Sequence, residues 1–138
     1  MLICDTGPLV AALSRRDKHH AVCAELLLRH SGELAAPAPV VTETALFALA
    51  NLGSDAQNRF LEGVAGSELE VLDLELADHK RIAELCRLYA DLPLDQVDAS
   101  VVAVAERLGC QQVASLDWRH LGVVRLAGGR FLELLPTG

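Results

Sequence analysis

Short apolar runs alternate with amphipathic helical patterns along the whole chain. The apolar runs, which have the length of buried strands, cover residues 2–4, 34–36, 69–74, 112–116, 123–125 and 131–134. Helical spacing of apolar residues covers residues 9–13, 19–30, 40–52, 55–65, 75–89 and 96–108. This alternation predicts an α/β fold with helices on both faces of a central, mainly parallel sheet, an α/β/α sandwich. We expect one domain over residues 1–138.

Two carboxylates lie on predicted helices without a cation one turn away. The helix over residues 40–52 is apolar on nearly every side, which predicts a buried helix, yet it carries Glu43. Asp98 has apolar neighbours and the like charge of Asp95. Because a buried carboxylate is costly without a compensating charge, both residues call for a partner from elsewhere in the fold.

Two further carboxylates directly follow predicted strands. Asp5 ends the first apolar run and Asp117 follows the run over residues 112–116. In open parallel sheets the ligand site lies outside the carboxyl ends of the strands. If the helices of Glu43 and Asp98 pack over this edge, four carboxylates meet without a matching cation. Such a set favours a hard divalent metal, Mg²⁺ or Mn²⁺.

Each of these acids also has an ordinary structural interpretation. Asp5 could cap the helix that follows it. Asp98 could complement the helix dipole, with Asp95 as the N-cap. Asp117 could close a turn, whereas Glu43 has the weakest alternative of this kind. The metal interpretation is favoured only for the set as a whole.

Composition narrows the class of protein. The chain is 51% hydrophobic, with 12 basic and 19 acidic residues and a net charge of −7. This composition excludes a disordered protein, and no apolar stretch reaches the ~18 residues of a membrane span. The four cysteines are scattered and no signal peptide is evident, which indicates a reduced, cytoplasmic protein without a membrane. A pI near 5.1 excludes binding to nucleic acid through overall charge alone.

Four short motifs stand in order along the chain: DTGPL at 5–9, VTE at 41–43, LPLDQVDAS at 92–100 and ASLD at 114–117. With these motifs the chain resembles the PIN-domain ribonucleases, and in particular the VapC-like toxins of prokaryotic toxin–antitoxin pairs. The resemblance covers nearly the whole chain.

The resemblance implies roles for particular residues. The acidic quartet of the family corresponds to Asp5, Glu43, Asp98 and Asp117, as catalytic and metal-binding residues. Its supporting hydroxyl groups correspond to Thr6 and Ser115. Asp95 is an additional acid, expected either to contact water around the metal or to cap the helix. Arg15 and Arg16 are hypothetical RNA contacts, and His120 is interpreted as a surface or helix-end residue.

The activity implied is hydrolysis of RNA phosphodiester bonds by an Mg²⁺- or Mn²⁺-dependent endoribonuclease. The resemblance further implies inhibition by a cognate antitoxin protein and assembly as a homodimer. The alternative is a catalytically silent PIN fold that serves as an interaction module. A phosphatase or receiver domain is disfavoured, because no second aspartate stands two residues after Asp5 and no lysine follows the later strands.

Overall fold

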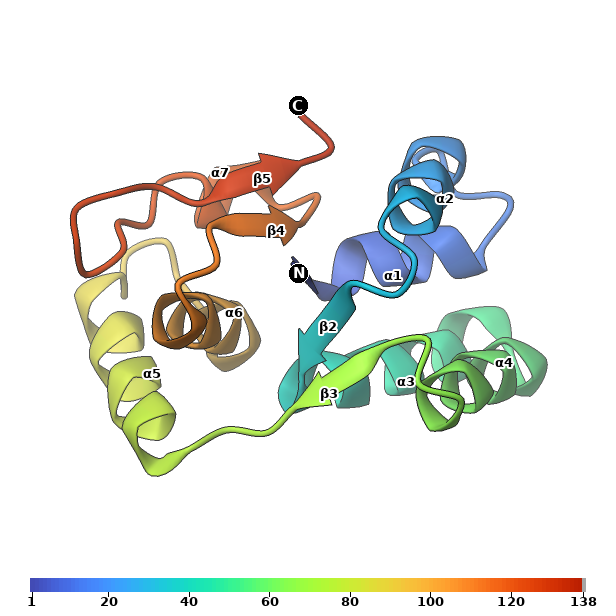
Figure 1. Ribbon diagram of the computed structural model, residues 1–138, viewed down its shortest axis with the longest axis horizontal. Coiled ribbons are helices and arrows are strands. Elements are labelled where there is room, and N and C mark those ends of the chain that lie inside the picture. The colour runs from blue at the N-terminus through green and yellow to red at the C-terminus, as the bar shows by residue number, and fades with distance from the viewer. Residues whose placement is uncertain (138) are drawn as a thin grey trace.

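A computed structural model describes residues 1–137 and contains one five-stranded sheet (Figure 1). Its strands, in the order β3-β2-β1-β4-β5, are all parallel to their neighbours. They are β1 (Leu2–Cys4), β2 (Leu34–Pro37), β3 (Glu70–Leu72), β4 (Gln112–Ala114) and β5 (Glu133–Leu135). The predicted α/β fold with a parallel sheet is confirmed.

Helices flank the sheet on both sides. Figure 1 shows α5 and α6 to the left of the sheet and α1 to α4 to its right. The helices are α1 (Thr6–Leu13), α2 (His20–Arg29), α3 (Ala38–Leu52), α4 (Ser54–Ala65), α5 (Leu76–Leu88), α6 (Gln96–Leu108) and the short α7 (Trp118–Leu121). Within the described residues, none of these helices is long and apolar enough to cross a membrane.

The core is built around β1 and α6. Leu2, Ile3 and Cys4 of β1 are completely buried, because this strand lies at the centre of the sheet. Residues 99–105 of α6 are all buried as well. The first turn of α6, which carries Asp98, is therefore fixed against the rest of the protein.

Two predictions for the C-terminal part were wrong. Residues 123–125 form no strand, because only an isolated antiparallel bridge joins Arg125 to Phe131. The last strand spans Glu133–Leu135, so it begins later than the predicted run over 131–134. The short helix α7 was not predicted at all.

The expected burial of α3 was also wrong. Val40, Ala45 and Ala48 are buried, but the opposite face leaves Leu46 60% and Phe47 44% exposed. A helix of this composition can bury its small residues against the protein and leave its large ones outside. Exposed apolar patches mark interaction surfaces. The homodimer nevertheless stays a prediction.

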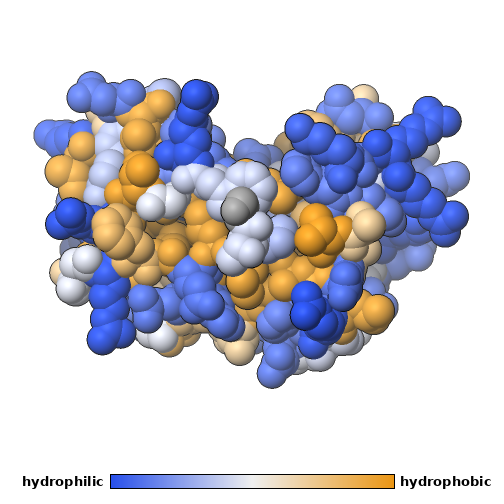
Figure 2. Space-filling view, turned by 90° about the horizontal axis from the view of Figure 1, so that it is seen from above, coloured by the Kyte–Doolittle hydropathy of each residue, from blue (hydrophilic) through white to orange (hydrophobic). Residues whose placement is uncertain are grey.

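The surface has two lobes when seen from above. Figure 2 shows a notch between the left lobe, over α5 and α6, and the right lobe, over α1 to α4. The rim of the right lobe is mainly hydrophilic. Chain segments that are far apart in sequence therefore face each other across this notch.

Candidate metal centre

Asp5 lies where β1 passes into α1. Its backbone N–H donates to the Ala114 carbonyl at 2.8 Å, so the pairing of β1 with β4 continues to this residue. One carboxylate oxygen accepts the Thr6 N–H at 2.8 Å, and the other accepts the Ser115 hydroxyl at 2.9 Å. The side chain caps α1, as its structural interpretation expected, and it is only 6% exposed. A helix cap and a metal ligand are compatible roles, because a carboxylate has several lone pairs.

Ser115 connects the ends of two neighbouring strands. Its hydroxyl is buried, donates to Asp5 and accepts the Asp117 N–H at 2.9 Å. Because β1 and β4 pair in register at Cys4 and Ala114, the residues after each strand emerge side by side. The structure thus brings Asp5 and Asp117 together through one hydroxyl group.

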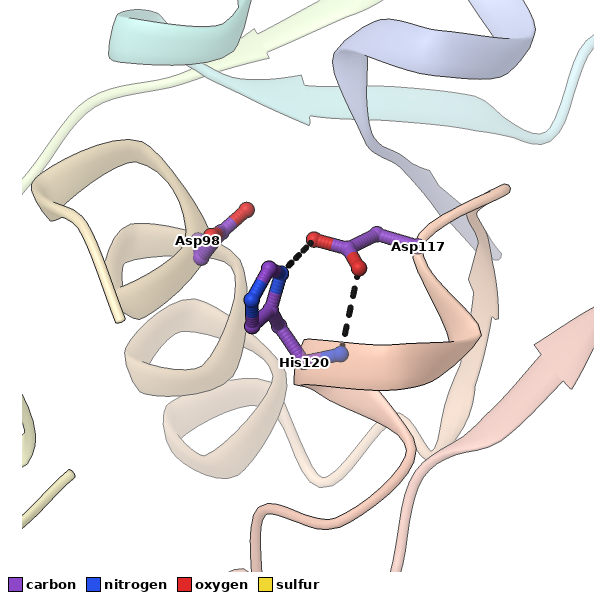
Figure 3. Close-up of side chains that lie close together, drawn as sticks. All are labelled: Asp98, Asp117 and His120. Carbon is purple, nitrogen blue, oxygen red and sulfur yellow. Dashed lines mark hydrogen bonds and ion pairs between the residues drawn. The ribbon is translucent and has the colours of Figure 1, made fainter. Parts of the chain in front are cut away.

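Asp117 caps the short helix α7. Its Oδ1 accepts the backbone N–H of His120 at 3.1 Å, and its Oδ2 lies 3.0 Å from the ring nitrogen Nδ1 of His120 (Figure 3). These two contacts fix the carboxylate in one orientation.

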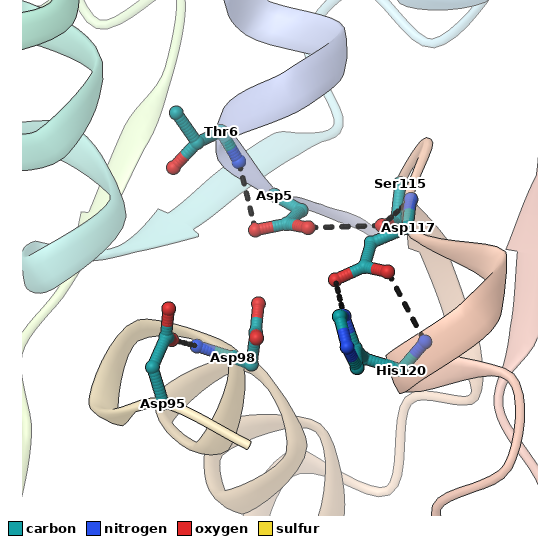
Figure 4. Close-up of polar contacts among 7 residues, drawn as sticks. All are labelled: Asp5, Thr6, Asp95, Asp98, Ser115, Asp117 and His120. Carbon is teal, nitrogen blue, oxygen red and sulfur yellow. Dashed lines mark hydrogen bonds and ion pairs between the residues drawn. The ribbon is translucent and has the colours of Figure 1, made fainter. Parts of the chain in front are cut away.

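Asp98 approaches the same place from α6. Asp95 caps that helix, since its Oδ1 accepts the Asp98 N–H at 2.8 Å. Figure 4 shows the carboxylates of Asp5, Asp98 and Asp117 directed toward one common space. Asp98, Asp117 and His120 each offer a possible metal-binding atom, and these three atoms lie within 4.8 Å of one another.

Glu43 takes a more peripheral position than its sequence suggested. It is exposed on α3, and it borders a depression of about 620 Å³ together with Gln96 and Val97, which precede Asp98. Its charge nevertheless reaches the buried carboxylate, because it contributes to raising the pKa of Asp5. Glu43 therefore lies at the rim of the cluster, not in its buried part.

The electrostatics of the cluster disfavour charge on its buried acids. Burial raises the pKa of Asp5 to about 6, against the opposing hydrogen bonds from Thr6 and Ser115. Burial, together with the negative charges of Asp5, Asp95 and Asp117, raises the pKa of Asp98 to about 7. Desolvation and repulsion by like charges both stabilise the protonated form. The cluster is thus a site that lacks positive charge.

The comparisons with known proteins agree with this geometry. Residues 2–126 match the family model of the PIN domain. The chain belongs to the PIN-domain family. Membership confirms the family that the four motifs indicated.

Relatives of this PIN domain include VapC proteins. It is 28% identical to Ribonuclease VapC26 of Mycobacterium tuberculosis over 135 residues, which is 98% of this chain and 100% of that protein. Two crystal structures are similar in fold. VapC20 of M. tuberculosis, described as a sarcin–ricin loop cleaving toxin, has a TM-score of 0.76 at 18% identity and covers 82% of this chain and 87% of its own. DNA-bound VapBC of Salmonella typhimurium has a TM-score of 0.71 at 20% identity, with 97% and 98% covered.

The side chains of the PIN domain fit a hard divalent cation. Carboxylate oxygens are the ligands that Mg²⁺ and Mn²⁺ prefer, and three of them face one space. The Oγ1 atom of Thr6, beside Asp5, is buried and has no hydrogen-bond partner among residues 1–137. Acids that resist ionisation and a hydroxyl without a partner are both accounted for by a cation in that space.

The residue missed by the sequence reasoning is His120. It was interpreted as a surface or helix-end group, but it contacts Asp117 and lies in the same group as Asp98. The hydrogen bond to Asp117 is the main reason why the pKa of His120 is raised. The expectation of a cluster without any basic side chain was therefore too strict. Its signal was the D-x-x-H spacing, which places the ring one helical turn from a capping acid.

The two expected RNA contacts are not part of the cluster. Arg15 and Arg16 are exposed in the connection between α1 and α2, at the end of α1 opposite to Asp5. Their contact with RNA stays a prediction.

The metal-free protein is expected to become more stable as the pH falls from 8 to 5. The pKa of Asp5 is about 6 in the folded protein against an ordinary value of 3.8, so the folded state binds a proton that the unfolded state does not. Stability is thus highest at low pH and is lost as the pH rises through 6, and Asp98 acts in the same direction. Asp5 alone accounts for about 1–2 kcal/mol over this range. Urea denaturation in EDTA at several pH values measures it. A flat or opposite profile would show that these acids are already compensated.

Proposed function

We propose that this PIN domain is a metal-dependent endoribonuclease that hydrolyses RNA phosphodiester bonds and acts as the toxin of a toxin–antitoxin pair. The observation that carries the proposal is the meeting of Asp5, Asp98 and Asp117 in one space with too little positive charge. The likeness to Ribonuclease VapC26 over nearly the whole chain supports RNA as the substrate.

Asp5, Asp98 and Asp117 would hold the ion, Mg²⁺ or Mn²⁺, with Glu43 adding negative charge at the rim. When bound, a divalent ion supplies Lewis-acid activation of water and of the scissile phosphate. Ser115 and the Thr6 N–H orient the two oxygens of Asp5, while His120 orients Asp117. Because the pKa values of Asp5 and Asp98 are raised in the metal-free protein, both acids give up protons when the cation binds.

The attacking group is water in this proposal, because the nearest thiol is not available as a nucleophile. Cys4 directly precedes Asp5, but it is completely buried in β1. Burial raises the pKa of its thiol to about 12, so it stays protonated at neutral pH. The thiolate is the reactive form of cysteine, and Cys4 therefore contributes packing and no covalent chemistry.

The proposal includes a cognate antitoxin, an assembly of two copies of the chain, and a cytoplasmic location, where the RNA substrates are found. VapBC of Salmonella typhimurium has the same fold over nearly the whole chain, which supports a partner of this kind. Since the cluster is negatively charged, an inhibitor would gain most by placing a basic side chain there.

The purified protein is expected to cut single-stranded RNA in Mn²⁺ or Mg²⁺ and to stop when EDTA is added. Gel analysis of a 5′-labelled RNA measures the rate in each condition. Two negative results have different meanings. Binding of Mn²⁺ without cleavage of any RNA would favour the silent interaction module. Absence of metal binding would contradict the metal centre itself.

A further inference from the structure

We propose that a basic depression, formed by Arg15, Arg16 and Arg59, binds a backbone phosphate of the RNA at a distance from the carboxylates. This inference rests on the proposed function, because it assumes that RNA is the substrate. It gives the protein a second contact with the same strand, of the sequence-independent kind that positions a nucleic acid.

The depression lies where several elements end. It has a volume of about 440 Å³ and is bordered by the end of α1, the connection to α2, the end of α3 and the first turns of α4. Besides the three arginines, its lining includes Ser14 and Asn51, whose side chains can hydrogen-bond to phosphate oxygens. No acidic residue lines it. In a chain with a net charge of −7, this is a local excess of positive charge.

The three arginines are not engaged elsewhere. Among residues 1–137, Arg15, Arg16 and Arg59 form no ion pair, in contrast to arginines such as Arg81 on α5. Asp17, the acid next to Arg16, uses its carboxylate to accept the His19 N–H at 2.8 Å. The guanidinium groups are thus available to a ligand, and their planar forks suit phosphate oxygens.

The position of the depression predicts which phosphate it binds. Asp5 caps the first turn of α1 and Arg15 follows its last, a separation of about 15 Å at 1.5 Å per residue. On α3, Glu43 and Asn51 are separated in the same direction by about 12 Å. A stacked strand advances about 3.4 Å per nucleotide. The bound phosphate is therefore about four nucleotides away from the scissile bond.

Binding is best measured without cleavage, in protein that carries Asp5→Asn. In this background we compare Arg15→Gln/Arg59→Gln with Arg87→Gln, which removes an exposed arginine of α5 that lies outside the depression and in no ion pair among residues 1–137. Fluorescence anisotropy of a labelled 12-nucleotide RNA gives the affinity at 50 to 300 mM salt.

The double variant is expected to bind about tenfold more weakly at 0.15 M salt, since each lost phosphate contact lowers the salt slope by about 0.7. Its log–log slope falls by about 1.4, and Arg87→Gln changes neither quantity. With Asp5 intact, the double variant raises KM and leaves kcat unchanged.

Three results would overturn the inference. An unchanged slope with a lower melting temperature would mean that the arginines only complement the negative ends of α1 and α3. Unchanged RNA binding with weaker binding of the antitoxin would make the depression a protein interface. A slope that falls equally in Arg87→Gln would indicate attraction by overall charge. If the wild-type protein cuts no RNA but the double variant still lowers the slope, the proposed function fails while the phosphate site stands.

Discussion

Replacing Asp5 by asparagine is expected to lower RNA cleavage about 10³-fold or more and to leave the metal-free protein at least as stable at pH 7.5. Cleavage is lost because the amide removes a buried anionic ligand from the centre of the cluster. Stability is kept because the charged carboxylate is itself unfavourable in the fold, with a pKa raised to about 6. Its neutralisation regains about 3 kcal/mol, which offsets about 1.5–3 kcal/mol from the weakened hydrogen bonds to Thr6 and Ser115.

The two parts of this prediction are measured separately, by single-turnover cleavage and by urea denaturation in EDTA. Glu33→Gln is a matched control, because Glu33 is exposed and precedes β2, at the opposite edge of the sheet from the cluster. It should change neither quantity. If Asp5→Asn instead cost several kcal/mol in EDTA, Asp5 would belong to a structural ion pair.

Mn²⁺ is expected to stabilise the wild-type protein by about 2.7 kcal/mol at a concentration of 100 times its dissociation constant. The cation binds the folded cluster and not the separated acids of the unfolded chain. In Asp98→Asn this gain should largely disappear, since Asp98 is one of the three residues whose ligand atoms converge. The gain should also shrink at pH 5.5, below the pKa of Asp98 at about 7, because protons then compete with the ion.

Thermal denaturation with and without Mn²⁺ measures this effect in the wild-type protein, in Asp98→Asn and in Glu33→Gln. The control variant should keep the full gain. An equal gain in Asp98→Asn would place the ion elsewhere on the protein. The shift with pH gives an independent check, because binding to exposed carboxylates of ordinary pKa would change little between pH 7.5 and 5.5.

The central part of the site was predictable because strand ends are simple to locate. Asp5 and Asp117 each follow a short apolar run, and a parallel sheet brings such ends to one edge. The neighbouring positions of β1 and β4 then follow from the sheet order, and Ser115 joins their ends. Asp98 was predictable for a different reason, because the apolar pattern after it fixes which face of α6 is buried.

The rest depended on information that local patterns do not contain. α3 is rich in apolar residues on all sides, so periodicity could not decide that Ala45 and Ala48 face inward while Leu46 and Phe47 face outward. The exposure of Glu43 follows from that choice. The four residues of α7 are too few to show a helical period, which is why His120 was placed on the surface and not beside Asp117.

The cluster draws its acids from both ends of the chain, and its last hydroxyl and carboxylate arrive with β4. During synthesis on the ribosome, β1 has no β4 beside it until residue 114 has left the exit tunnel. A growing or prematurely terminated polypeptide therefore carries Asp5 without Ser115 and Asp117, and it has no assembled centre. A protein that attacks RNA is in this way inactive toward the machinery that makes it until translation is nearly finished.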